Sequence, residues 1–493
     1  MRDLVSKPQL WGSRWQDARI ERAMIRRDTK DLPTPHRNQS MGAVSGFVGG
    51  LILLSVIGFI VAKVSPQSSQ HDSKFIVTAS GGRYVEYQDR FSPVLNVASA
   101  RLILGTPEPV KSVKDAVKGT RPADQTLGIE NAPEVLLPKD DDTARWTVCD
   151  AHGTSLSLTA ASNVKTTLIA GVSDLSGHKA ISSPNAVAVR DPDTPGQVWV
   201  LWGNRRATVG GEDRAAQSVL GLNPDIVGKA APISRGLLNA ITPAPPITAP
   251  FIPARGEPST AVPGMRNGDV ARSKTVTGEN TFTVVYDDGV QQIPTFVADL
   301  LAATGSAITT TPAAGLVKAA RVHHVDVDAF PAEAPVYVQS PVLCWSWTRG
   351  ANDAAATTRL TIGDQLPLSP AETVQITKLL DPIGTIEQAQ QSFTEPGKGW
   401  YVRVTGDGRS SEAREQLLWI DDKGVRYFIG LDGNSYDGTV KALGINVHEP
   451  LLIPWSIAQL YGQGPTLSKE AALVHHENSP PDPGQKAAPK PKK

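Results

Sequence analysis

A long uncharged segment near the N-terminus constrains this chain more than any other feature. Met41 to Ala62 (MGAVSGFVGGLILLSVIGFIVA) contains no charged side chain. As a helix it is about 33 Å long, which matches the roughly 30 Å hydrocarbon core of a bilayer. A cleaved signal peptide would have a shorter apolar run closer to the N-terminus. We therefore predict one transmembrane helix over residues 41–62, and the alternative is a helix buried in a protein core.

Positive charge on the two sides of this segment predicts its orientation. The basic residues shortly before it are Arg22, Arg26, Arg27, Lys30 and Arg37, and those shortly after it are Lys63, Lys74 and Arg83. The side richer in positive charge stays in the cytoplasm. We expect residues 1–40 to be cytoplasmic, and residues 63–476 to form a domain on the outer side of the membrane.

Three glycines recur every four residues in the predicted span: Gly42, Gly46 and Gly50. Glycine at this spacing leaves one helix face flat, so another backbone can approach it closely. We predict that this face packs against another helix in an assembly. The alternative is that glycine is simply frequent in membrane helices.

The predicted cytoplasmic segment contains an amphipathic basic pattern over residues 14–28 (RWQDARIERAMIRRD). Its apolar residues include Trp15, Met24 and Ile25. Such helices lie on anionic lipid or dock on a partner protein. The acidic residues within this pattern favour docking over binding to lipid alone.

The chain has two cysteines, Cys149 and Cys344. In a domain placed outside the cytoplasm, two cysteines are expected to be joined, because that compartment permits disulfides. The alternative is two buried thiols. Two cysteines without nearby histidines do not make a zinc site.

One pattern of a strand, a turn and an amphipathic helix returns four times. The copies cover residues 82–105, 198–222, 282–302 and 425–445. Each copy is too small to fold alone, and the spacing between copies is uneven. The sequence therefore predicts an α+β domain of four repeats with a separate central unit between them. The tail, residues 477–493, has no apolar residue larger than alanine or proline, and we expect it to be disordered.

Gly105 to Ser112 (GTPEPVKS) partly resembles a phosphate-binding loop, with Lys111 and Ser112 in place. Val110 stands where the motif needs glycine. Pro107 and Pro109 each remove a backbone amide that would bind phosphate. Nucleotide binding here, with ATP as the ligand, is therefore the weaker alternative.

His323, His324, Asp326 and Asp328 (HHVDVD) are the best candidate metal ligands, because alternate residues of a strand share one face. An exposed polar face with Val325 and Val327 pointing inward explains the same pattern, and we prefer it. No catalytic signature of a common hydrolase or zinc protease occurs. We assign no catalytic residue, metal or cofactor. Lys+Arg and Asp+Glu are equal at 49 each, so overall charge does not favour nucleic acid as a partner.

Motifs along nearly the whole chain resemble the EccB family, a single-span core component of type VII (ESX) secretion systems in mycobacteria and their relatives. The motifs are AMIRRDTK (23–30), SPVLNVASARLILG (92–105), WTVCD (146–150), DDGVQQIP (287–294), GWYVRVTG (399–406) and PWSIAQLYGQGPTLSKEAAL (454–473). One departure is Glu130-Asn131, where many family members have a Pro-Gly pair.

The resemblance implies a periplasmic domain of four repeats around a central β-rich domain, with a disulfide at Cys149 and Cys344. It implies pairing of such domains in an inner-membrane complex with EccC, EccD and EccE, and a mycosin protease nearby. The expected role is structural support of protein export. EccB proteins are often labelled ATPases, so an ATP-hydrolysing component is one alternative, and a periplasmic cell-wall-binding module is another.

Overall fold

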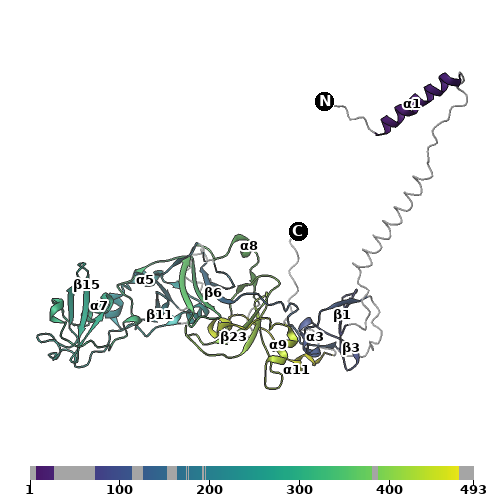
Figure 1. Cartoon of the computed structure of the whole chain (residues 1–493). Coiled ribbons are helices and arrows are strands. Elements are labelled where there is room, and N and C mark those ends of the chain that lie inside the picture. The colour runs from purple at the N-terminus through teal and green to yellow at the C-terminus, as the bar shows by residue number, and fades with distance from the viewer. Residues whose placement is uncertain are drawn as a thin grey trace. The chain divides into compact units, whose positions relative to one another are not determined.

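This computed structural model describes residues 7–26, 73–113, 126–152, 164–173, 175, 177–190, 194, 196–379 and 387–476. The chain forms two compact units, Met1–Ser69 and Gln70–Lys493. In the first unit the description covers one helix, α1 (Lys7–Arg26), which overlaps the helix predicted over residues 14–28 (Figure 1). None of the helices described is long and apolar enough to cross a membrane. The predicted span 41–62 and the predicted tail 477–493 lie outside the described residues.

The second unit begins with a small sheet that we name module 1. Its strands are β1 (Phe75–Thr78), β2 (Arg83–Tyr87), β3 (Arg90–Pro93) and β4 (Lys111–Val113), in the order β3-β2-β1-β4. The first three strands are antiparallel neighbours, and β4 runs parallel to β1. A parallel return needs a crossover connection, which α3 (Val97–Leu104) supplies. Gln88 and Asp89 both have positive φ, as a tight hairpin turn between β2 and β3 requires.

Three further sheets have the same strand order. Module 2 contains β9 (Asn185–Arg190), β10 (Val198–Trp202), β11 (Arg205–Thr208), β12 (Ala231–Pro232) and β13 (Thr242–Pro243), with α4 (Arg214–Val219), α5 (Pro224–Lys229) and α6 (Arg235–Ala240). Module 3 contains β14 (Val270–Lys274), β15 (Asn280–Val285), β16 (Val290–Ile293), β17 (Ile308–Thr310) and α7 (Thr295–Ala303). Module 4 contains β23 (Trp400–Thr405), β24 (Leu417–Ile420), β25 (Val425–Phe428), β26 (Leu451–Pro454) and β27 (Gly462–Gln463), with α9 (Asp437–Leu443) and α10 (Trp455–Ala458). In each, three antiparallel strands are followed by a strand parallel to the first.

The repeating unit in the structure is larger than the strand, turn and helix predicted from sequence. The predicted copies 82–105, 198–222 and 282–302 fall on a two-stranded hairpin followed by a helix. The copy 425–445 begins only at β25, the second strand of its hairpin, and continues to α9. The first and fourth strands of each module lie outside the predicted copies, because short strands without clear alternation give little sequence signal.

A seven-stranded central sheet lies between the modules in sequence. Its order is β21-β22-β7-β6-β19-β20-β8. The strands are β6 (Thr143–His152), β7 (Val164–Ala170), β8 (Lys179–Ala180), β19 (Val342–Gly350), β20 (Thr357–Gly363), β21 (Thr377–Lys378) and β22 (Gln391–Phe393). Alternation along β6 separates its two faces: Trp146 and Val148 join the largest core, and Cys149 joins a smaller core on the other face.

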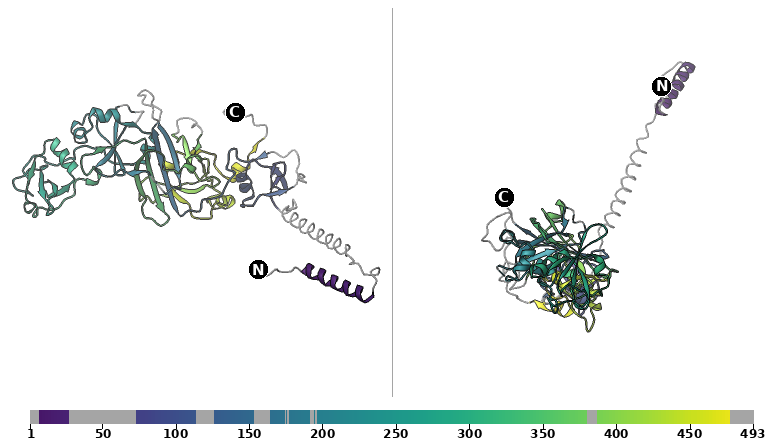
Figure 2. Two further views of the ribbon diagram at one scale, coloured as in Figure 1. Left: turned by 90° about the horizontal axis from the view of Figure 1, so that it is seen from above. Right: turned by 90° about the vertical axis from the view of Figure 1, so that its left-hand side faces the viewer.

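Shared cores fix the succession of the parts within the second unit. Modules 3 and 2 share one core, where α7 packs against α4. Modules 2 and 4 both pack on the central sheet, where α6 meets α10. Modules 4 and 1 share a third core, where α3 contacts α9 and α11 (Lys469–Ala472). Figure 1 labels β15, β11, β6, β23 and β1 in this order, and the left view of Figure 2 shows the same succession.

The inner strands of the central sheet relate two similar halves of the unit. Module 1, β6, β7 and module 2 recur in the same order as module 3, β19, β20 and module 4. The inner order β7-β6-β19-β20 is antiparallel throughout, so it is unchanged when the halves are exchanged. β1 begins at Phe75 and β14 at Val270, the same separation of 195 residues that divides Cys149 from Cys344.

The remaining described elements connect the ends of the unit. β28 (His475–His476) pairs antiparallel with β5 (Thr126–Leu127). Leu127 also forms a parallel bridge to Val94 beside β3. The last described residues are therefore joined to module 1. The short strand β18 (Val336–Tyr337) pairs in parallel with β9 of module 2. Other short elements are α8 (Pro370–Thr373), η2 (Ala313–Gly315) and η3 (Val327–Ala329).

Candidate functional site

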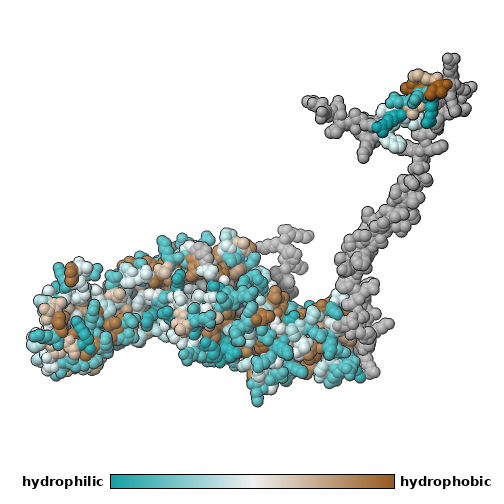
Figure 3. Space-filling view, viewed as in Figure 1, coloured by the Kyte–Doolittle hydropathy of each residue, from teal (hydrophilic) through white to brown (hydrophobic). Residues whose placement is uncertain are grey.

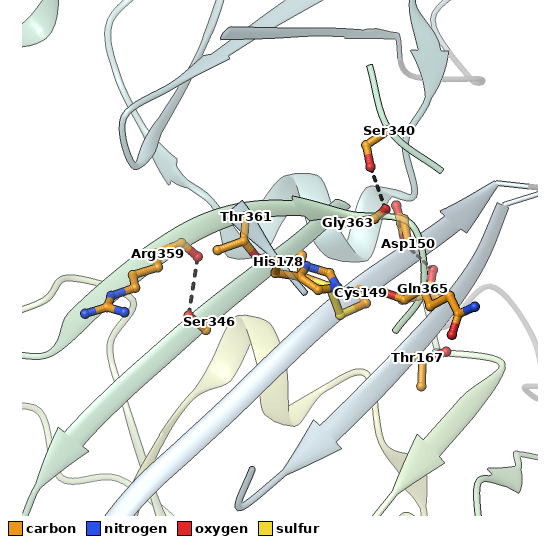
Figure 4. The surroundings of a disulfide bond; sticks show 12 residues. Cys149, Asp150, Thr167, His178, Ser340, Ser346, Arg359, Thr361, Gly363 and Gln365 are labelled. Atoms are coloured by element: carbon orange, nitrogen blue, oxygen red, sulfur yellow. Dashed lines mark hydrogen bonds between the residues drawn. A yellow bond between two sulfur atoms is a disulfide. The ribbon is translucent and has the colours of Figure 1, made fainter. Parts of the chain in front are cut away.

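The two cysteines lie directly opposite each other on β6 and β19, and their sulfur atoms are bonded (Figure 4). Their Cα atoms are 4.1 Å apart, close to the spacing of about 4.5 Å in non-hydrogen-bonded antiparallel pairs. On their outer sides Cys149 pairs with Thr167 and Cys344 with Thr361. The disulfide expected from the sequence is thus present where the two similar halves meet.

The disulfide is closed off from solvent. Both cysteines are completely buried among Ile169, Val342 and Phe393. The segment after β20 covers them with Leu366, Leu368 and Ile376. We name residues 364–376 the strap. Its helix α8 begins with a capping box, in which Ser369 and Glu372 bind each other's backbone amides. A bond buried in this way acts as a structural link and not as an exposed redox centre.

His178 fixes the start of the strap beside the disulfide (Figure 4). Its Nε2 donates to the carbonyl of Gln365 at 2.6 Å, and its Nδ1 accepts from the Thr361 hydroxyl at 3.3 Å. Gly363 is required here, because a Cβ at that position would lie 2.5 Å from His178 Nε2. The ring therefore connects β20 to the strap.

Asp150, next to Cys149, ties the central sheet to module 2. One carboxylate oxygen, Oδ1, accepts from the Thr166 hydroxyl at 2.7 Å and the Ser234 hydroxyl at 2.9 Å. The other accepts from the Ser234 backbone amide at 2.7 Å. Ser234 also caps the N-terminus of α6. Complete burial raises the pKa of Asp150, and the hydrogen bonds from Ser234 and Thr166 oppose that rise.

Trp146 makes the corresponding connection to module 4. Its indole Nε1 donates to the Leu452 carbonyl on β26 at 2.8 Å. Its ring meets the Trp400 ring edge to face, with centroids 5.2 Å apart. Gly171 allows Trp400 to approach, because a Cβ there would lie 2.6 Å from the Trp400 ring. The central sheet thus holds both flanking modules through buried side chains.

The segment resembling a phosphate-binding loop has the opposite polarity to such a loop. Gly105 ends α3 as its left-handed C-cap, so the segment leaves the negative end of a helix. Lys111 and Ser112 lie in β4, paired in parallel with Ile76 and Val77 of β1. A phosphate loop instead joins a strand to the N-terminus of a helix. Pro107 packs near Gly444 at the end of α9, so the segment contributes to the contact between modules 1 and 4.

Residues 323–328 do not form the strand that alternation predicts. Asp326 accepts from the Asp328 amide and caps the 3₁₀ helix η3. His324 Nε2 lies 2.9 Å from Asp288 Oδ2, and its ring meets the Tyr286 ring edge to face. Among the residues that the structure describes, no group of three potential ligands converges on a metal position. Val325 and Val327 contribute to the core of modules 2 and 3, as the preferred interpretation expects.

The glycines of the predicted span, Gly42, Gly46 and Gly50, lie outside the described residues. The helix before them exposes apolar side chains: Trp11, Met24 and Ile25 are 77%, 73% and 75% exposed. In Figure 3 apolar and polar surface lie side by side on α1. Arg19 stacks over Trp15, so the basic and apolar residues of this helix are close neighbours.

Comparison with known proteins gives one consistent result. The family model described as "Type VII secretion system ESX-1, transport TM domain B" (EccB) matches residues 2–481. The chain is 32% identical to the ESX-5 secretion system ATPase EccB5 of Mycobacterium tuberculosis (strain ATCC 25618 / H37Rv), covering 97% of this chain and 95% of the relative. It is 32% identical to the ESX-3 secretion system ATPase EccB3 of Mycolicibacterium smegmatis, covering 97% and 92%.

Solved structures agree over most of the chain. A chain of an intact ESX-5 inner membrane complex superposes with a TM-score of 0.74 at 29% identity, covering 99% of both chains. An EccB3 dimer from the ESX-3 core complex gives a TM-score of 0.69 at 29% identity, covering 82% of this chain and 100% of that chain. The mixed α+β fold and the motifs quoted from the sequence therefore indicate the same family. The chain belongs to the EccB family of type VII secretion systems.

Proposed function

We propose that this chain is a structural core subunit of a type VII (ESX) secretion complex in the inner membrane, where it supports protein export. The observation that carries the proposal is the match along 99% of the chain to a subunit of an intact ESX-5 inner membrane complex. The fold supports a structural role, because buried contacts of Asp150 and Trp146 join the central sheet to modules 2 and 4. The Cys149–Cys344 disulfide joins the two halves of the central sheet.

The proposed topology has residues 41–62 crossing the membrane once, residues 1–40 in the cytoplasm and the second unit in the periplasm. The uncharged sequence of 41–62 and the basic residues before it support this orientation. The disulfide supports it as well, because disulfides persist in oxidising compartments. One of the superposing structures is described as a periplasmic assembly from the ESX-5 inner membrane complex.

The proposed architecture is four copies of one unit around a central β-rich domain. The shared strand order of modules 1 to 4 supports common descent of the copies. The proposed partners, which follow from the family resemblance, are EccC, EccD, EccE and a mycosin protease. We also propose that the periplasmic units pair with one another, and the solved EccB3 dimer supports this.

The assembly proposal can be tested at the glycine face of the predicted span. Gly46→Leu places a branched side chain on that face, and Val48→Leu adds one methylene about half a turn away. We expect both proteins to insert, and only Gly46→Leu to reduce recovery of the large complex on native gels. Equal recovery for the two variants would remove helix packing at this face from the proposal.

An ATP-hydrolysing role is the alternative, and the names of the EccB5 and EccB3 relatives favour it. Such a role would act at Lys111 and Ser112. Lys111→Ala in the purified full-length protein, compared with Lys318→Ala on module 3, decides between the two functions. We expect equal ATP turnover in both variants, and loss of turnover in Lys111→Ala alone would replace our proposal.

A further inference from the structure

A cleft at the junction of the central sheet and module 4 concentrates arginine side chains. The cleft has a volume of ≈ 380 Å³. Arg349 comes from the end of β19, Arg403 from β23 and Arg414 from the loop before β24. The segment Glu449 to Leu452, which runs into β26 beside β23, also lines the cleft. Three arginines and one short, largely apolar segment thus line the same cleft.

Arg349 shapes this cleft. Its side chain is buried, at 6% exposure. It donates to the carbonyls of Asp353, Ser411 and Ala354 at 3.1, 2.9 and 3.2 Å. These bonds use three of its five N–H groups and hold the surrounding loops in place. Carbonyl oxygens carry no net charge, and among the described residues Arg349 forms no ion pair.

The other two arginines are available to a ligand. In the part of the chain that the structure describes, neither Arg403 nor Arg414 forms an ion pair. Arg414 Nη1 donates only to the neighbouring Ala413 carbonyl, at 2.9 Å. Among the described residues lining the cleft, Glu449 is the single acid against three arginines. The cleft therefore has an excess of positive charge.

The cleft continues into a longer groove. A second depression of ≈ 610 Å³ shares Arg403, Glu449 and Pro450 with it and extends to Asp437 and Lys441 of α9, one acid and one base. Tyr401 lines this extension, and burial raises its pKa to about 12. The positive charge of Arg403 opposes that rise, and the negative charges of Glu449 and Asp437 add to it. Two adjoining depressions that share lining residues accommodate an extended chain better than a small compact ligand.

We propose that this groove binds an extended acidic peptide segment of a partner protein. Arginine binds carboxylate through two parallel hydrogen bonds, which suits Arg403 and Arg414 to aspartate or glutamate side chains. Pro450, Leu451 and Leu452 offer contact area to apolar residues between the acids. A uniform polyanion such as polyphosphate would place charge against Glu449, whereas a peptide can place a neutral residue there. The inference is independent of the assembly role proposed above, because it rests on these residues alone.

Fluorescence anisotropy tests the proposal. It measures binding of a fluorescein-labelled peptide of alternating glutamate and leucine to the full-length protein in detergent. We expect binding that weakens as salt rises from about 0.05 to about 0.5 M, since exposed charges are screened over a shorter distance. The double variant Arg403→Gln/Arg414→Gln should bind about tenfold more weakly or worse. Arg403→Lys should give an intermediate loss, because lysine keeps the charge without the bidentate geometry.

The matched control is Arg359→Gln/Arg321→Gln, which removes two exposed arginines elsewhere and changes net charge equally. It should bind like the unaltered protein. The same far-UV circular dichroism in all variants shows that the fold is retained. Three outcomes would overturn the proposal: no binding of the peptide, equal loss in the control variant, or binding of polyphosphate without binding of the peptide.

Discussion

The indole Nε1 of Trp146 donates a hydrogen bond of 2.8 Å to the carbonyl of Leu452, across 306 positions of the sequence. This single bond joins β6 of the central sheet to β26 of module 4. The Trp146 side chain is almost fully buried, at 1% exposure. Buried contacts such as this one, between the central sheet and a flanking module, lead to testable predictions about stability.

Trp146→Phe should destabilise the second unit by about 1 to 3 kcal/mol, because it leaves the Leu452 carbonyl buried without its donor. The midpoint of thermal unfolding of the full-length protein in detergent measures the effect. Trp11→Phe on the exposed surface of α1 is the control and should leave the midpoint unchanged. Equal midpoints for both variants would show that the Trp146 bond contributes nothing to stability.

Reductant should leave the Cys149–Cys344 bond intact until the protein unfolds, because both sulfur atoms are buried beneath the strap. Mass spectrometry after thiol alkylation would then detect free cysteine only when denaturant and dithiothreitol are present together. The variant Cys149→Ser/Cys344→Ser cannot form the bond, and its free energy of unfolding should be lower by about 2 to 5 kcal/mol. Rapid alkylation without denaturant would mean that the strap opens readily.

Asp150 should make stability depend on pH. Its pKa is raised by burial in the folded protein above the ordinary value of 3.8, so the folded state holds the proton more tightly. The resulting stabilisation is complete below about pH 4 and is lost as pH rises through the folded-state pKa. Asp150→Asn cannot titrate. The thermal midpoint of the unaltered protein should therefore fall relative to that of Asp150→Asn as pH increases.

The matching control for this pH series is Glu412→Gln, which removes an exposed carboxylate in the loop before β24 of module 4. Its midpoint should follow that of the unaltered protein at every pH. Asp150→Asn should also be less stable throughout, since its amide N–H₂ group would meet the Ser234 amide donor. Parallel curves for Asp150→Asn and the unaltered protein would contradict the role of the buried carboxyl.

Two glycines separate the effect of a steric clash from that of backbone strain. Gly171 and Gly177 have φ of +77° and +81°, so alanine is strained at both. Only at Gly171 would the new Cβ meet another group, the Trp400 ring at 2.6 Å. Gly177→Ala should lower the free energy of unfolding by about 1 kcal/mol, and Gly171→Ala should lower it by at least about 1 kcal/mol more. Urea unfolding followed by tryptophan fluorescence compares them, and equal losses would argue against tight packing of Trp400.

The sequence predicted features that depend on local pattern or on compartment. The amphipathic runs of α3 and α7 were recognisable because their apolar residues recur with helical spacing. Cys149 and Cys344 could be paired because the chain contains no other cysteine. The local structure of residues 323–328 was not predicted correctly, because alternation suggested a strand whereas Asp326 caps a short helix.

Long-range partners could not be found from the sequence. Nothing in WTVCD shows that Asp150 binds Ser234, which lies 84 positions later. Strand β12 consists only of Ala231 and Pro232, too short for any periodic signal. The arginine groove is likewise assembled from β19, β23 and the segment before β26, which are far apart in the chain.

The pairing of β28 with β5 has a consequence for the time course of folding. Proteins emerge from the ribosome N-terminus first, and early domains usually fold while later ones are still being made. Module 1 cannot fold completely while later segments are being made, because its core includes Leu443, Leu467 and Ala472. Its neighbouring strand β5 also pairs with His475 of β28. The first module to be synthesised is therefore completed by the last described residues of the chain. Complete folding of the whole unit depends on the segment that ends at His476.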